Sequence, residues 1–234
     1  KNGISILEEI KKNDYILSKT KSAQIKLIDN LVSENKKNVS VSSSKNTSIK
    51  KSNDYIVEDS IVIVDTLDGS GTGFYITKNH ILTNHHVVED SNFVNLKNMQ
   101  NDTFTGKVIA KDISTDLAII EVDYESRPLQ LEPSCKVDRR ENVFTVGHPK
   151  GFEYSTSRGI VSSIRNIPNP FYKATGKKLY IQIDASISSG NSGGPLFNSD
   201  EYVIGVNTWG RTDGQNLNFA VHCSEVQSFI EENL

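Results

Sequence analysis

A serine between glycines is the feature of this sequence that most directly suggests chemistry. Ser192 lies in the segment SSGNSGGPL at 188–196, on a predicted turn between two strands. Glycines let the main chain fold tightly, so that the N–H groups of Gly190 and Ser192 can point at one spot, as the oxyanion of a tetrahedral intermediate requires. Taken alone, the segment fits a plain Gly/Ser hairpin loop equally well. A phosphate-binding loop is disfavoured, because no Lys-Ser or Lys-Thr pair follows.

A serine hydroxyl becomes a good nucleophile only when a base takes its proton, and two other segments supply a base and a carboxylate. In TNHHVV at 83–88, His85 and His86 follow an apolar strand, and in TDLAII at 115–120, Asp116 directly precedes one. Each residue alone has an ordinary structural explanation, such as an aspartate in a turn. Their joint occurrence in the order His, Asp, Ser predicts a triad for acyl transfer.

The remaining histidines and the two cysteines show no spacing typical of metal ligands. His80, His148 and His222 lie beside predicted strands, and no His-Glu-x-x-His or paired-cysteine motif is present. A metalloprotease is therefore disfavoured, and no metal or other cofactor is predicted. We expect Cys135 and Cys223 to be separate, buried free thiols, since two distant cysteines are too few for a disulfide scaffold. Free thiols favour a reducing compartment.

The elements that must position these residues are mostly strands. From Tyr55 onward, short β-branched and aromatic runs alternate with Gly, Asn, Asp and Pro, which predicts an all-β, antiparallel protein. Ser224 and Gln227 form a capping-box pattern before an apolar helical stripe, which predicts a C-terminal helix packed on the strands. The predicted strands are 61–64, 73–77, 104–110, 117–122, 143–146, 159–164, 179–184, 203–209 and 217–221.

The first 54 residues differ in composition from the rest. They hold 11 lysines and no arginine against 6 acidic residues, a net charge of +5. We expect an amphipathic helical segment at 1–34, a flexible Ser/Asn/Lys-rich linker at 35–54, and the main domain at 55–234. Since a short helix is marginal in water by itself, residues 4–34 are candidates for binding a partner or a second copy of the chain.

Charge and hydropathy exclude several classes of function. The whole chain carries a net charge of −3, so it has no basic field for nucleic acid, and its basic segment at 1–54 has only Tyr15 for base stacking. No apolar run reaches the roughly 18 residues that a membrane span needs, and residues 1–20 lack the pattern of a signal peptide. We expect a cytoplasmic protein, or an extracytoplasmic one if an upstream signal has been removed.

Taken together, these motifs resemble the HtrA/Deg branch of the trypsin-fold serine proteases. The resemblance covers about 60–225 and is carried by GSGTGF, TNHHVV, TDLAII, SRGIVSSI, IDASISSGNSGGPL, VIGVNTWG and LNFAV. It implies a trypsin-like pair of perpendicular six-stranded antiparallel β-barrels with the active site in the cleft between them. It also implies His86 as the general base, Asp116 as its orienting carboxylate and Ser192 as the nucleophile. His85 occupies a variable position of the family motif.

The resemblance further implies where substrate would bind. It places the oxyanion hole at Gly190, Asn191 and Ser192, and the substrate-binding residues at Ser186, Ile187, Thr208, Trp209 and Asn218. Because neither Ser186 nor Asn218 is charged, we expect cleavage after small to medium uncharged residues. The implied function is a serine endopeptidase that acts on proteins or peptides, and the alternative is a catalytically silent trypsin-fold module that binds peptides.

Three departures from the family pattern modify these expectations. Asn191 stands where digestive trypsin-like enzymes have Asp, so activation by a newly cut N-terminus is not expected. Ser189 stands where many HtrA proteins have Pro, which would permit an inactive resting loop. We also expect no PDZ domain within these residues, since the predicted C-terminal helix reaches Leu234.

Overall fold

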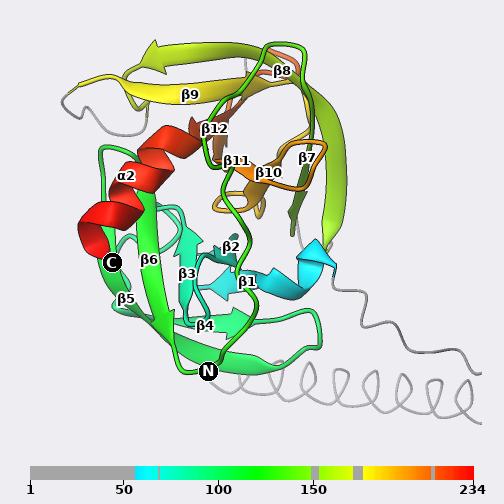
Figure 1. Ribbon diagram of the computed structural model, residues 1–234. Coiled ribbons are helices and arrows are strands. Elements are labelled where there is room, and N and C mark those ends of the chain that lie inside the picture. Colours follow the sequence, from blue (N-terminus) through cyan, green and yellow to red (C-terminus); the bar gives the residue numbers. More distant parts are fainter. Residues whose placement is uncertain (1–55, 68, 149–152, 171–175, 212–213) are drawn as a thin grey trace, which may run out of the picture. The chain divides into compact units, whose positions relative to one another are not determined.

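The computed structural model describes residues 56–67, 69–148, 153–170, 176–211 and 214–234 (Figure 1). The helical segment predicted at 1–34 and the linker predicted at 35–54 lie outside the described residues. The described chain starts with a short 3-10 helix, η1 (Val57–Ser60), that leads directly into the first strand.

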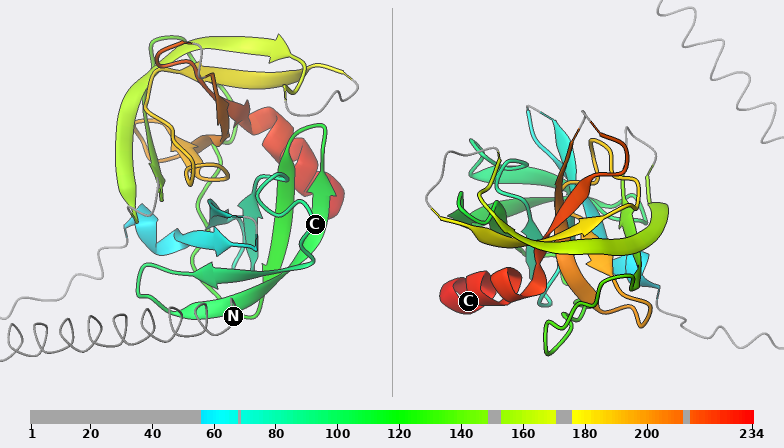
Figure 2. Two further views of the ribbon diagram at one scale, coloured as in Figure 1. Left: turned by 180° about the vertical axis from the view of Figure 1, so that it is seen from behind. Right: turned by 90° about the horizontal axis from the view of Figure 1, so that it is seen from above.

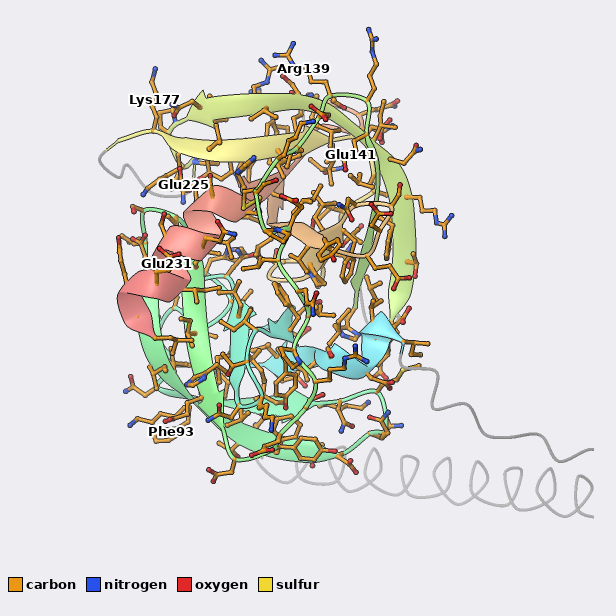
Figure 3. All side chains as sticks on the ribbon, in the orientation of Figure 1. Phe93, Arg139, Glu141, Lys177, Glu225 and Glu231 are labelled. Carbon is orange, nitrogen blue, oxygen red and sulfur yellow. A yellow bond between two sulfur atoms is a disulfide. The ribbon has the colours of Figure 1, made fainter. Side chains whose placement is uncertain are left out.

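Six strands close into the first barrel, in the order β1-β2-β3-β6-β5-β4, and all neighbours are antiparallel. Their bounds are β1 (Ile61–Asp65), β2 (Ser70–Tyr75), β3 (His80–Thr83), β4 (Phe93–Lys97), β5 (Thr103–Asp112) and β6 (Leu117–Val122). β4 was not among the predicted strands, because its five residues bury only Val94 and Leu96 and give a weak pattern. Its first residue, Phe93, is exposed on the outside of the barrel (Figure 3).

The second barrel repeats this plan, in the order β10-β11-β12-β9-β8-β7. Its strands are β7 (Asn142–Gly147), β8 (Ser155–Ile167), β9 (Lys178–Ile183), β10 (Pro195–Phe197), β11 (Val203–Gly210) and β12 (Asn218–His222). The described residues thus form two closed, six-stranded antiparallel barrels, and the predicted fold is confirmed. Figure 2 shows the same strands from behind and from above.

A buried apolar cluster joins the two barrels. Phe74 on β2 and Leu117 on β6 belong to it, together with Tyr180 on β9 and Phe197 on β10 of the second barrel. All four are fully buried, and each large side chain removed from water stabilises the docked state by roughly 1.5–3 kcal/mol. The relative position of the barrels, and hence of any site between them, is therefore set by packing.

The C-terminal helix α2 (Cys223–Asn233) packs on the second barrel, against β11, β12 and β9 (Figure 1). The predicted cap at Ser224 is wrong by two residues. His222 is the N-cap, and its Nδ1 accepts the main-chain N–H of Ser224 at 3.1 Å. An imidazole nitrogen that is not protonated serves here as well as the Ser or Asp oxygen on which the capping rule is based. Glu225 then accepts the N–H of Leu179, which ties the helix to β9.

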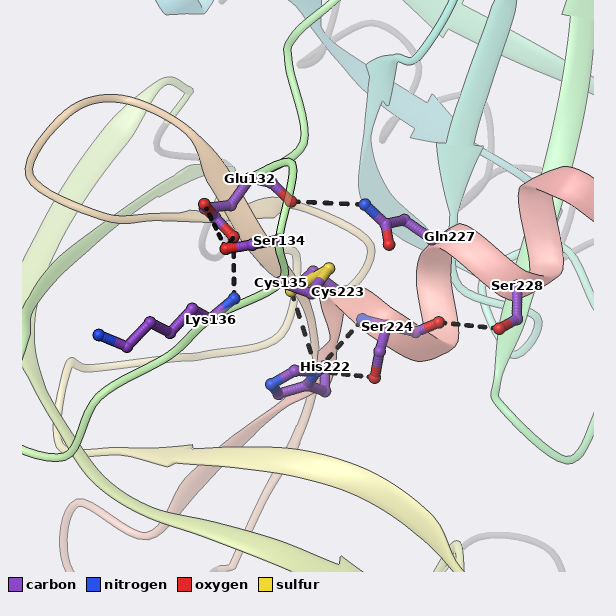
Figure 4. Close-up of a disulfide and its surroundings, with 9 residues drawn as sticks. All are labelled: Glu132, Ser134, Cys135, Lys136, His222, Cys223, Ser224, Gln227 and Ser228. Atoms are coloured by element: carbon purple, nitrogen blue, oxygen red, sulfur yellow. Dashed lines mark hydrogen bonds between the residues drawn. A yellow bond between two sulfur atoms is a disulfide. The ribbon is translucent and has the colours of Figure 1, made fainter.

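The expectation of two separate free thiols is also wrong. Cys135 and Cys223 form a disulfide with a Cα–Cα distance of 5.5 Å, although 88 residues separate them in sequence (Figure 4). Cys135 lies in the connection between β6 and β7, and Cys223 is the first residue of α2. Closure of the second barrel brings the end of β12 back to the connection through which the chain entered, a long-range contact that local sequence patterns do not reveal.

Candidate active site

The turn that leads into β6 presents Asp116. Before it, the Asp112 carboxylate accepts the N–H of Ser114 at 2.8 Å and the hydroxyl of Thr115 at 2.6 Å. Burial disfavours the charged form of Asp112, but the hydrogen bonds from Thr115 and Ser114 outweigh it and hold the pKa of Asp112 below its ordinary value. Asp116 then adopts a left-handed conformation (φ 60°), which Asp tolerates better than most residues.

Asp116 is fully buried and holds His86 in place. Its Oδ2 lies 2.8 Å from Nδ1 of His86 and accepts the hydroxyl of Thr208 at 2.5 Å, while its Oδ1 accepts the main-chain N–H of His86 at 3.0 Å. The carboxylate thereby favours the tautomer with the proton on Nδ1, which leaves Nε2 of His86 to act as a base. His85 is placed differently, since its main-chain N–H binds the carbonyl of Asp116 at 3.1 Å.

The loop around Ser192 forms a turn suited to bind an oxyanion. The N–H of Asn191 donates to the carbonyl of Ser188 at 3.0 Å, and Gly190 between them has φ +100°, a conformation that glycine adopts without strain. Because the N–H of Asn191 is engaged in this turn, Gly190 and Ser192 remain as candidate oxyanion donors from the predicted set of Gly190, Asn191 and Ser192. Ser189 occupies the second position of this turn.

A cavity of about 600 Å³ opens beside Ser192 and His86. It is lined by Thr66, Gly69, Ser70, His86, Val87, Glu89, Asp90 and Ser91 of the first barrel and by Ser189, Gly190 and Ser192 of the second. The Ser192 hydroxyl donates to the carbonyl of Thr208 at 3.3 Å, which is long for an O–H···O hydrogen bond. His86 and Ser192 thus come from different barrels and line one cavity.

The residues predicted to bind substrate lie around β11 and the end of β9. Thr208 is buried and bound to Asp116, and the Trp209 ring stacks on Phe219 at a centroid distance of 3.8 Å. The Asn218 side chain is buried, and its Nδ2 donates to the carbonyl of Ala185 at 2.8 Å.

The other two members of that set lie in the connection that follows β9. Ser186 is exposed and Ile187 is half-buried. Of Ser186 and Asn218, whose lack of charge led us to expect cleavage after uncharged residues, only Asn218 is therefore a buried side chain.

The other histidines have structural partners. Nδ1 of His80 hydrogen-bonds to the hydroxyl of Thr77, and Nδ1 of His148 accepts the N–H of Tyr154. Burial lowers the pKa of His148 to about 4, so this ring is neutral at physiological pH. Within the described ranges, no group of three or more His, Cys, Asp or Glu side chains could hold a metal ion.

Two threonines that sequence reasoning missed also contact the nucleophile loop. The hydroxyl of Thr72 donates to the carbonyl of Gly190 at 2.6 Å, and the hydroxyl of Thr83 donates to the carbonyl of Thr72 at 2.8 Å. A side chain at Gly193 would collide with both threonines. The sequence feature that could have indicated Thr72 is its position between two glycines in GSGTGF. The glycines are the more conspicuous residues of that segment, so the threonine was missed.

Comparison with known proteins agrees with this geometry. Residues 71–206, more than half of the chain, match the family described as the trypsin-like peptidase domain. The chain is 35% identical over 168 residues to the putative serine protease HhoB of Synechocystis sp., covering 71% of this chain and 40% of that protein. It is 39% identical over 142 residues to a probable periplasmic serine endoprotease DegP-like of Hahella chejuensis, covering 59% of this chain and 29% of that protein.

Among solved structures, the active form of the Rv3671c protease from M. tuberculosis superposes with a TM-score of 0.70 and 25% identity, covering 76% of this chain and 82% of that one. The chain therefore spans less than half the length of the two curated relatives, but most of the length of this solved protease chain.

Proposed function

Because the chain belongs to the trypsin-like peptidase family, in its HtrA/DegP-like branch, we propose that it is a serine endopeptidase with the triad His86, Asp116 and Ser192. One observation carries this proposal. The buried carboxylate of Asp116 is bound to His86 beside a cavity that His86 shares with Ser192.

The mechanism follows from the roles of these groups. Nε2 of His86 takes the proton of the Ser192 hydroxyl as its oxygen attacks the scissile carbonyl, and Asp116 stabilises the imidazolium that forms. The N–H groups of Gly190 and Ser192 bind the oxyanion of the tetrahedral intermediate. Its collapse releases the amine, which receives the proton from His86, and leaves an acyl-enzyme that water hydrolyses by the same steps.

We infer a neutral, shallow pocket for the residue before the scissile bond. The pocket that the family resemblance predicts has Asn218 in its wall, and the Asn218 amide is uncharged, buried and hydrogen-bonded to the carbonyl of Ala185. Small to medium uncharged residues such as Val, Ala, Thr, Ser or Leu fit such a pocket.

The proposal is tested by labelling the 234-residue protein with a fluorophosphonate probe and by profiling a peptide library. We expect the probe to label Ser192, the Ser192→Ala variant to be unlabelled, and the variant to lose cleavage of every peptide. Selective cleavage after Lys, Arg, Asp or Glu would contradict the neutral pocket and leave the triad assignment intact.

The alternative function is a trypsin-fold module that captures peptides without cleaving them. The hydrogen bond from the Ser192 hydroxyl to Thr208 favours it, since that hydroxyl is directed at a carbonyl rather than at a base. If folded protein that binds peptides is neither labelled nor able to cleave them, this alternative replaces the protease.

We propose that the protein works outside the cytoplasm. The disulfide between Cys135 and Cys223 supports this, because such bonds persist in oxidising compartments, and so does the periplasmic name of the Hahella relative. The expectation of a cytoplasmic protein is without support. No helix in the described part of the chain is long and apolar enough to cross a membrane. This is tested by rapid alkylation of intact cells followed by mass spectrometry of the protein. We expect both cysteines to be oxidised and therefore not alkylated.

We also propose that residues 4–34 bind a partner or a second copy of the chain. Sedimentation of the 1–234 and 55–234 proteins compares their assembly states. The proposal is contradicted if both proteins sediment with the same number of chains per particle and if the 1–234 protein gains no partner from an extract of its native source.

A further inference from the structure

We propose that Thr72 is a positioning residue for the reaction: its hydroxyl fixes the oxyanion turn of the second barrel against the barrel that carries the general base. This inference rests on the proposed protease function and adds to it a residue outside the triad, the oxyanion donors and the specificity pocket.

Thr72 lies fully buried on β2 and holds the nucleophile loop on both sides of Ser192. Its hydroxyl donates to the carbonyl of Gly190 at 2.6 Å, and its main-chain N–H donates to the carbonyl of Ser192 at 2.8 Å. The peptide unit between Gly190 and Asn191 is thereby bound at both ends. Its carbonyl accepts the Thr72 hydroxyl, and its N–H donates to the carbonyl of Ser188 at 3.0 Å. The hydroxyl of Thr72 is the only one of these donors that a side-chain substitution can remove.

The other half of the loop is held by the second barrel itself. The N–H of Gly193 donates to the carbonyl of Asn207 at 2.8 Å, and the N–H of Asn207 donates to Gly194 at 2.9 Å. These bonds keep the C-terminal part of the loop on β11. On the N-terminal part, where Gly190 lies, the hydrogen bond from Thr72 is the one that reaches beyond the loop among the described residues.

Thr72 connects this turn to the base by a short path. The hydroxyl of Thr83 on the neighbouring strand β3 donates to the carbonyl of Thr72 at 2.8 Å. Thr83 lies three residues before His86 in the chain. The oxyanion donor and the base, which belong to different barrels, are therefore linked through two threonines.

The size of the expected effect follows from the geometry of catalysis. Loss of one oxyanion donor costs roughly 100- to 1,000-fold in kcat, and a misplacement of about 1 Å can cost 100-fold. Removal of the Thr72 hydroxyl loosens the turn without deleting the donor, so we expect a kcat about 10- to 100-fold lower. KM should change by less than about 3-fold, because no substrate contact is lost.

The experiment compares Thr72→Val, which keeps the shape and loses the hydroxyl, with Thr72→Ser, which keeps the hydroxyl. Tyr75→Phe is the matched control, because it also removes the hydroxyl of a buried residue from β2. The Tyr75 hydroxyl donates to the carbonyl of Tyr124 at 2.9 Å, which lies outside the loop around Ser192. We measure kcat, KM, urea unfolding, and the affinities for a peptide boronic acid and for the matching non-covalent product peptide. Thr72→Ala serves if the valine variant does not fold.

The expected result is a loss of kcat and of boronic acid affinity in Thr72→Val, with product affinity unchanged and with recovery in Thr72→Ser. The inference is overturned if folded Thr72→Val keeps kcat within 2-fold, or if Tyr75→Phe loses as much. If the wild-type protein is neither labelled by a fluorophosphonate nor active, the proposed function has failed and this inference falls with it. A labelled wild type tests Thr72 alone.

Discussion

At the scale of single residues, Asp116 is bound by donors from both barrels. His86 reaches it from the first barrel and Thr208 from the second. An asparagine at position 116 would place an N–H₂ donor opposite Nδ1 of His86 or the hydroxyl of Thr208, which both need an acceptor. The imidazole would then no longer be held with its proton on Nδ1.

We therefore expect Asp116→Asn, His86→Ala and Ser192→Ala each to abolish most turnover in a folded protein. Combining them should cost little more, because the three residues act as one unit. His85→Ala is the matched control and should keep kcat within a few-fold. Steady-state kinetics with a peptide substrate decide this, and comparable losses at His85 and His86 would overturn the assignment of the base.

Asn218 should control the size of the accepted side chain. Its amide contacts the main chain of Gly210, and a side chain at Gly210 would collide with it. In Asn218→Gly the pocket gains this volume, so cleavage after Phe or Leu should rise relative to cleavage after Ala by about 10-fold in kcat/KM, the range for a few methylene groups. Asn216→Gly, at an exposed position two residues earlier, is the control. An unchanged preference in Asn218→Gly would place the pocket elsewhere.

At the scale of elements, the end of β7 carries a pH-sensitive contact. Burial is the main cause that lowers the pKa of His148 to about 4. The charge of Glu153 opposes this shift, and the charge of Lys97 adds to it. In the unfolded chain the same group titrates near ~6.5, so the unfolded state binds more protons between these values. Stability that is complete above pH 6.5 is therefore lost as the pH falls towards 4, by about 2 kcal/mol at pH 5.

The measurement is urea unfolding of the wild type and of His148→Gln at pH 7.5 and 5.0. The wild type should lose about 2 kcal/mol more than the variant between the two pH values. The same pH dependence in both proteins would show that His148 is not the group responsible.

The disulfide joins two other elements, the β6–β7 connection and the first turn of α2. Its loop of 88 residues restricts the unfolded chain strongly, and its loss should lower the free energy of unfolding by about 3 kcal/mol. Neither cysteine lines the cavity beside Ser192, so Cys135→Ser/Cys223→Ser should keep kcat within about 3-fold. Unfolding curves and intact masses with and without reductant test this. Equal stability of the variant and the oxidised wild type would argue against the bond.

At the scale of the whole molecule, the strand-rich part carries a marked negative charge. Residues 55–234 hold 23 acidic and 15 basic residues, and Glu89 and Asp90 line the cavity, whose described lining contains no Lys or Arg. Such a field attracts basic peptides and weakens as salt rises.

We therefore expect kcat/KM for a Lys-rich substrate to fall several-fold between about 20 and 500 mM NaCl. An otherwise identical Glu-rich substrate should show the opposite trend. Glu89→Gln/Asp90→Asn should flatten both trends, and Glu231→Gln/Glu232→Gln on α2 should leave them unchanged. Identical salt dependence for the two substrates would contradict the prediction.

Local patterns in the sequence predicted the antiparallel strands and the candidate triad, whereas the arrangement of the strands in two barrels came from the resemblance to the HtrA/Deg proteases. Alternating apolar residues predicted the strands, and glycines around Ser192 predicted its exposed turn. The missed features are contacts between segments far apart in sequence. Thr72 reaches Gly190 only after both barrels have closed and docked, and Cys135 reaches Cys223 only after the second barrel has closed. His222 as a helix cap was missed because the usual cap residues are Ser, Thr, Asp and Asn.

The division of the site between the barrels has a consequence for the cell that makes this protein. The first barrel leaves the ribosome with His86 and Asp116, before Ser192 and the strands that hold it, β10 to β12, are made. N-terminal segments generally fold first during synthesis. A chain made only as far as the first barrel thus holds His86 and Asp116 without Ser192. The proposed triad can cleave a substrate only after the second barrel has been made and has docked on the first, so a partly folded chain is inactive as a protease.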